Sequence, residues 1–134
     1  MKKQMFFGIL LTIFFLSTVN ASNKNNSQIG EEKYNKIVDN LIIGAESKNN
    51  GLKISSTFHL GEFKASKSVI SLMRILHDDK NEDARISAAL ALIKVGDARG
   101  VYAVKRAAIY DDSERVKRLC EKFFSDYYHK SKKS

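Results

Sequence analysis

The feature that most constrains the fold of this chain is internal repetition. When the sequence is aligned with itself at an offset of 32 residues, similar residue types recur without a gap. The basic residues Lys53, Arg85 and Lys117 form one column, and a second column holds only small residues, Ser56, Ala88 and Cys120. A fixed period of this size is typical of solenoids, in which each repeat buries its apolar faces against its neighbours. The repetition therefore predicts a stack of similar units.

The clearest copy of the unit runs from Asn81 to Asp112. Residues 84–95 are almost all apolar, which predicts a helix that is buried on more than one side. Gly96 follows them, at the place where a helix commonly ends. Residues 98–110 carry a one-sided apolar stripe, which predicts a second, amphipathic helix. One unit is thus a helical hairpin.

Helical patterns continue on both sides of this unit. An amphipathic pattern begins at Glu31, and we expect the segment 49–51 (Asn-Asn-Gly) to end that helix. Further helices are predicted over residues 52–63, 66–77 and 113–128, and no segment has the alternation of a strand. We therefore expect residues 31–129 to form one all-α domain of about three helical hairpins, followed by a solvated basic tail at residues 130–134.

The most regular segment resembles a known repeat family. The sequence HDDKNEDARISAALALIKVGDARGVYAVKRAAIYDDSERVKRLC is similar to HEAT repeats of the short bacterial type, with an acidic turn, an Ala-Arg or Val-Lys pair, an alanine-rich helix and a Gly-Asp-x-Arg turn. In the preceding copy Lys64 and Ala65 replace the Gly-Asp pair. The resemblance implies an α-α superhelix, a HEAT-like solenoid, that binds other macromolecules or has a structural role. Within this superfamily the bilin-lyase-like members represent a catalytic alternative.

The N-terminal segment has the pattern of an export signal. Lys2 and Lys3 precede an apolar run of about 12 residues, and Val19-Asn20-Ala21 offers a small-x-small cleavage site. Residues 1–21 are therefore predicted to be a signal peptide and residues 22–30 a flexible linker. The run is shorter than a bilayer-spanning helix requires. We expect a periplasmic or extracellular protein; the alternative is a membrane-tethered protein with an uncleaved N-terminal segment.

Basic charge is concentrated toward the C-terminal end. The net charge is +8, and residues 115–134 contain seven basic against two acidic residues. Such an end could meet an acidic protein, anionic headgroups or nucleic acid. The export signal argues against nucleic acid as the physiological ligand. The alternative is a charged, solvated helix that only aids solubility.

The basic column has two interpretations. Lys53, Arg85 and Lys117 could form a binding surface, or they could bond to carbonyls and to acidic turn residues such as Asp79 and Asp111. We favour the structural interpretation. The candidate interaction surface as a whole contains these residues and three from the last predicted helix: Lys53, Arg85, Lys117, Arg118, Lys122 and Tyr128.

The remaining reactive residues predict no catalytic site, cofactor or metal. Cys120 lies in the small-residue column, which favours a buried, inert thiol over an intermolecular disulfide. The histidines are not at metal-binding spacing, and no phosphate loop, nucleophile elbow or carboxylate pair can be assembled. The sequence thus favours a non-catalytic protein-interaction or scaffolding module with an unidentified protein or envelope component as partner. A structural subunit of an envelope assembly, and less so a lyase-like accessory protein, are the alternatives, and the oligomeric state stays open.

Overall fold

The computed structural model describes residues 30–133, and among these residues it contains helices and no strand. The predicted signal peptide, and the predicted linker up to residue 29, lie outside the described residues. The chain divides into two compact units, Met1–Lys36 and Ile37–Ser134. In the first unit residues 30–36 are helical, and an ion pair of 2.7 Å joins Glu32 to Lys36. The helical segment continues to residue 45. Its apolar residues Val38 and Ala45 are buried, as its amphipathic pattern predicts.

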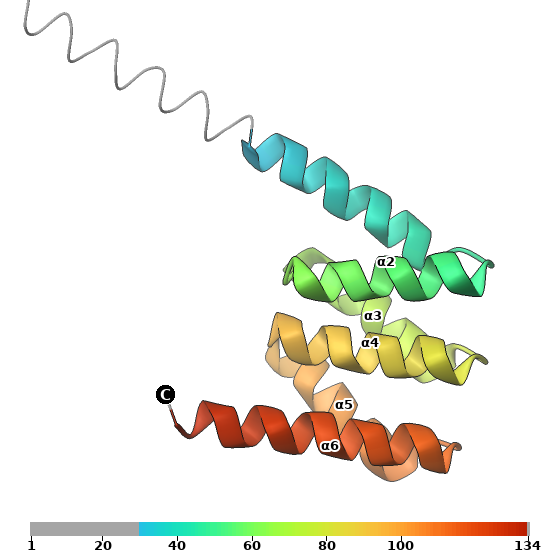
Figure 1. Ribbon diagram of the computed structural model, residues 1–134, viewed down its shortest axis with the longest axis vertical. Coiled ribbons are helices and arrows are strands. Elements are labelled where there is room, and N and C mark those ends of the chain that lie inside the picture. Colours follow the sequence, from blue (N-terminus) through green and yellow to red (C-terminus); the bar gives the residue numbers. More distant parts are fainter. Residues whose placement is uncertain (1–29, 134) are drawn as a thin grey trace, which may run out of the picture. The chain divides into compact units, whose positions relative to one another are not determined.

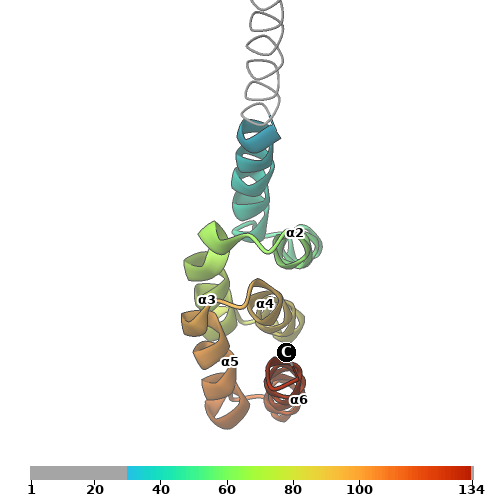
Figure 2. The ribbon, with the colours of Figure 1, turned by 90° about the vertical axis from the view of Figure 1, so that its left-hand side faces the viewer.

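The second unit holds the remaining helices in two layers. After the helical residues up to 45, these are α2 (Asn50–Glu62), η1 (Ser66–Ser68), α3 (Val69–Asp78), α4 (Glu82–Val95), α5 (Ala98–Tyr110) and α6 (Glu114–Ser131). Helix α4 packs against both α2 and α6, and α3 packs against α5. Figure 1 shows α2, α4 and α6 side by side, and Figure 2 shows α3 and α5 beside them in a second layer. The all-α fold class is thereby confirmed.

The turns before α2, α4 and α6 repeat the same hydrogen bond at intervals of 32 residues. The side chains of Ser47, Asp79 and Asp111 each accept a hydrogen bond from the amide two residues later, at 3.1, 2.9 and 2.8 Å. This local bond is the usual role of Ser and Asp in turns. The 32-residue period therefore has a structural counterpart that extends one copy further toward the N-terminus than the sequence resemblance does.

The residue whose amide donates each of these bonds is also the N-cap of the following helix. The side chains of Asn49, Asn81 and Ser113 accept hydrogen bonds from the amides three residues later, at 3.0, 3.0 and 3.3 Å. Each bond satisfies one of the amides that a helix N-terminus leaves without an intrahelical partner. Three successive helices of the α2–α4–α6 layer thus begin in the same way.

A second recurrence lies at the other end of the hairpins. Gly96 ends α4 in the left-handed region with φ of 76°, and its amide donates to the carbonyl of Leu92. Lys64 is the equivalent residue of the preceding copy and adopts φ of 48°, the one positive φ of a non-glycine residue among those described. A lysine therefore takes a conformation that costs a side-chain-bearing residue about 1 kcal/mol.

The core is built from equivalent positions of successive helices. Leu60 and Leu92 are fully buried, as are Leu72 and Val104 in the other layer. Close packing of α2 on α4 requires Gly61, because a Cβ there would lie 2.8 Å from the Cα of Ala91. The small-residue column Ser56, Ala88 and Cys120 is also buried. The predicted burial of Cys120 is confirmed, and burial raises the pKa of its thiol to about 12, so the thiol is inert.

Three predicted boundaries are wrong. The segment 49–51 does not merely end the first helix, because Asn49 caps α2 and residues 50 and 51 form its first turn. The helix predicted over 66–77 opens with the 3₁₀ turn η1 before α3 begins at Val69. The last helix continues to Ser131 rather than 128, since no glycine or proline interrupts it and its basic last turn suits the negative end of the helix dipole.

Candidate functional site

Lys53, the first member of the basic column, forms an ion pair with the turn that follows its own helical hairpin. Lys53 on α2 donates to a carboxylate oxygen of Asp79, in the turn between α3 and α4. Only 13% of either side chain is exposed. Burial acts to raise the pKa of Asp79, but hydrogen bonds from Lys53 and from the Asn81 amide outweigh it and leave that pKa below its usual value. The contact stabilises the ionised carboxylate, and with it the turn.

Arg85 makes the equivalent contact one repeat later, with more bonds. Its Nε and Nη2 donate to the two carboxylate oxygens of Asp111 at 3.0 and 2.9 Å, and its Nη1 donates to the carbonyl of Asp79 at 2.9 Å. The side chains of Arg85 and Asp111 are 11% and 7% exposed. The bond to Asp111 raises the pKa of Arg85. We call these two contacts, Lys53–Asp79 and Arg85–Asp111, the polar ladder.

Lys117 has no equivalent partner within the described residues. Its ammonium group pairs with Glu114 of the same helix at 2.8 Å, and 30% of its side chain is exposed. The hydrogen bond with Glu114 raises the pKa of Lys117. The basic column is therefore not uniform. Two of its members bond to acidic turn residues, as the structural interpretation predicts, and the third pairs within its own helix.

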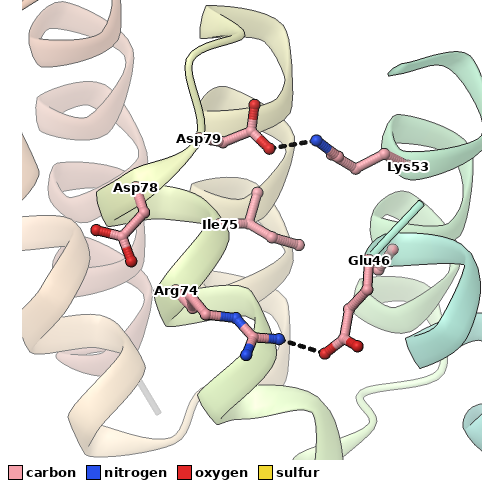
Figure 3. Close-up of a pocket in the computed structure, with 7 residues that line it drawn as sticks. Glu46, Lys53, Arg74, Ile75, Asp78 and Asp79 are labelled. Atoms are coloured by element: carbon pink, nitrogen blue, oxygen red, sulfur yellow. Dashed lines mark hydrogen bonds and ion pairs between the residues drawn. The ribbon is translucent and has the colours of Figure 1, made fainter. Parts of the chain in front are cut away.

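The polar ladder borders a small cavity, shown in Figure 3. This cavity, of about 240 Å³, is lined by Ala45, Glu46, Lys53, Arg74, Ile75, Asp78 and Asp79. Lys53 points to Asp79 and Arg74 points to Glu46, with Ile75 between the two pairs. Asp78 pairs with His77. Each charged side chain around the cavity thus already has a hydrogen-bond or ion-pair partner in the protein. Among residues 30–133 no group of three or more His, Cys, Asp or Glu side chains could hold a metal ion.

The other predicted interaction residues lie on α6. The side chain of Arg118 is exposed and has no hydrogen bond or ion pair with the described part of the chain. Lys122 pairs with Asp126 one turn later, at 3.2 Å. Tyr128 is half-exposed, its ring stacks on Phe124, and the ammonium of Lys132 lies 4.6 Å from the ring centroid. The structure thus separates these three residues from the buried pairs of Lys53 and Arg85.

A larger groove crosses the layer formed by α2, α4 and α6. It encloses about 520 Å³ and is lined by Gly61, Glu62, Lys64, Leu90, Ile93, Lys94, Phe123, Asp126, Tyr127 and Lys130. Its apolar walls come from Leu90 and Ile93 on α4 and from Phe123 and Tyr127 on α6, at spacings of three and four that place each pair on one helix face. Because lysines stand at its edges, we call this feature the lysine-rimmed groove.

None of the predicted interaction residues lines the lysine-rimmed groove. Leu90 and Ile93 lie in the helix 84–95 that the sequence predicts to be buried, and Phe123 and Tyr127 lie at helical spacing in the predicted helix 113–128; apolar residues in such patterns are normally buried. All four are only partly buried. The available signal was that the alanine-rich helix 84–95 is apolar on more than one side, which leaves apolar residues beyond those that its neighbours cover.

Comparison with models of known protein families gives no match, and comparison with curated proteins gives none either. The resemblance to HEAT repeats therefore stays an expectation from the sequence. No helix in residues 30–133 has the length and apolarity to cross a bilayer.

Proposed function

We propose that this chain is a HEAT-like α-solenoid that acts outside the cytoplasm as a non-catalytic protein-interaction module. The solenoid architecture is supported by the turn hydrogen bonds that recur at 32-residue intervals and by the layers α2–α4–α6 and α3–α5. Export is supported by the basic, apolar and small-residue pattern of residues 1–21.

The observation that carries the interaction role is the lysine-rimmed groove. It is built by three successive helices of one layer. Ile93 and Phe123 pack against the core, whereas Leu90 and Tyr127 also line the groove without belonging to the core cluster. Stacked repeats offer extended surfaces of this kind to other proteins without a deep pocket. The polar ladder favours the same role indirectly, because its charges are already paired with acidic turn residues and are not available to a partner.

The proposal is tested by site-specific photocrosslinking in the native cell. A photoreactive phenylalanine analogue is placed singly at Lys64 in the groove, at Arg118 on the outer side of α6 and at Tyr102 on α5. All three residues are exposed, so the folded protein should tolerate the substitutions. We expect a discrete protein adduct at Lys64 that is absent at Tyr102.

The outcomes separate the functional classes. An adduct that appears only at Arg118 or Tyr102 keeps the interaction role and moves it to another face. The absence of a protein adduct at all three positions would contradict the interaction role.

A further inference from the structure

We propose that the lysine-rimmed groove binds an acidic peptide segment of the partner, with an apolar side chain in the groove and carboxylates on the lysines at its rim. The inference rests on the proposed function and names the chemistry of the partner. It comes from the balance of charges around the groove and from the apolar walls between them.

The charges around the groove leave two lysines unpaired. Lys94 pairs with Glu62, and Asp126 pairs with Lys122 outside the groove. The side chains of Lys64 and Lys130 have no hydrogen bond or ion pair with the described residues, and both are exposed. The groove therefore presents two ammonium groups that a partner can neutralise, and every carboxylate that lines it is already occupied.

The two free lysines come from different elements. Lys64 follows α2 and is held in the left-handed conformation of the turn, whereas Lys130 lies on α6, three residues after Tyr127. The apolar walls of α4 and α6 also line the groove with them. A ligand that is complementary to both the lysines and the apolar walls needs carboxylates and at least one apolar side chain. A basic peptide would add its charge to those of Lys64 and Lys130.

The size of the groove suits a short segment rather than a whole folded surface. A volume of about 520 Å³ lies within the range of about 300–1,000 Å³ typical of small-ligand pockets, which accommodates one or two large side chains. We therefore expect the peptide to insert one apolar side chain into the groove as an anchor. The acidic residues next to it would supply charge complementarity to the lysines, which steers association.

The test selects ligands from a display library of random dodecapeptides on the full-length protein. The double variant Lys64→Glu, Lys130→Glu reverses the charge of the rim. The matched control is Lys48→Glu, Lys80→Glu, which makes the same change in net charge at exposed lysines that are outside the groove and have no side-chain partner among the described residues. Thermal unfolding verifies that both variants are folded.

We expect the selected peptides to carry two or more carboxylates near an apolar residue. Their affinity should fall roughly tenfold or more in the rim variant and by less than about threefold in the control, because only the rim variant replaces two local attractions with repulsions. The variant Tyr127→Ala, which keeps the rim charges, should also weaken binding.

Three results would overturn the inference. The first is a selection in which no peptide is enriched, and the second is enriched peptides whose affinities for the rim variant and the control are equal. The third is binding of the protein to phosphatidylglycerol vesicles, in place of peptides, through Lys64 and Lys130. The photocrosslinking experiment tests the interaction role separately. A partner crosslinked at Arg118 or Tyr102 would support that role even when the groove binds no peptide.

Discussion

Replacement of Arg85 by methionine should strongly destabilise the fold, because it leaves the Asp111 carboxylate largely buried without its cation. The guanidinium makes two bonds to Asp111 and one to the Asp79 carbonyl, and about a tenth of either side chain of the ion pair is exposed. Loss of one partner of a buried pair costs about 3–5 kcal/mol. The partial exposure, and the bond that Asp111 keeps from the Ser113 amide, reduce our expectation to about 2–4 kcal/mol.

Lysine occupies the equivalent position 53 of the preceding repeat, so Arg85→Lys is a milder substitution to compare with Arg85→Met. Arg85→Lys keeps a cation beside Asp111 but cannot retain all three bonds, so we expect a loss of about 1–2 kcal/mol. The exposed, unpaired Arg118 supplies the control, and Arg118→Met should change the free energy of unfolding by less than about 0.5 kcal/mol.

Urea unfolding followed by circular dichroism measures these differences, provided that the dependence on urea is the same in all variants. The double variant Arg85→Met, Asp111→Asn should recover part of the loss, because it removes the unpaired charge as well. A cost for Arg85→Met below about 1 kcal/mol, similar to that of an exposed ion pair, would refute the claim that the polar ladder stabilises the fold.

Three further predictions concern single positions. Lys64→Gly should stabilise the protein by up to about 1 kcal/mol because it relieves a left-handed φ, and Gly96→Ala should destabilise it by about 1–2 kcal/mol for the converse reason, as measured by urea unfolding. Thr57→Val should be neutral or stabilise by about 1 kcal/mol in the same assay, since the buried hydroxyl of Thr57 has no hydrogen-bond partner in the described chain. The pKa of Asp79 is lowered in the folded protein, so its contribution to stability is complete above pH about 4 and is lost as the pH falls through the pKa of the folded state. Asp79→Asn should therefore flatten the fall in stability between pH about 5 and 2. A change in stability of the opposite sign in any of these variants would contradict the structural reason given for that residue.

The sequence predicts the helices well because their signals are local. The one-sided apolar stripe predicts a helix over residues 98–110, which are the bounds of α5, and α6 begins at Glu114, one residue after the predicted start. The errors lie where a residue has two roles. Asn49 and Gly51 suggest the end of one helix, but the turn is so short that they already belong to the beginning of the next.

The candidate site was harder to predict because it depends on partial burial. A helical spacing of apolar residues indicates which side chains can share a face, and it does not indicate whether a neighbouring helix covers that face. Phe123 and Tyr127 share a face of α6 with the buried Val116 and Cys120, but they line a groove at its far end. Similarly, nothing local distinguishes Lys130, which is unpaired, from Lys94, which pairs with Glu62 of another helix.

The basic column shows why repetition alone cannot identify a binding residue. Lys53, Arg85 and Lys117 are equivalent by sequence, but what each contacts depends on the turn that lies opposite it. Lys53 contacts the carboxylate of Asp79, and Arg85 contacts the carboxylate of Asp111 and the carbonyl of Asp79. Lys117 pairs instead with Glu114 of its own helix. The first two positions are therefore poor places to seek a partner, since any substitution there also perturbs stability. Unpaired lysines beside an apolar wall, Lys64 and Lys130, offer a test in which binding and folding can be measured separately.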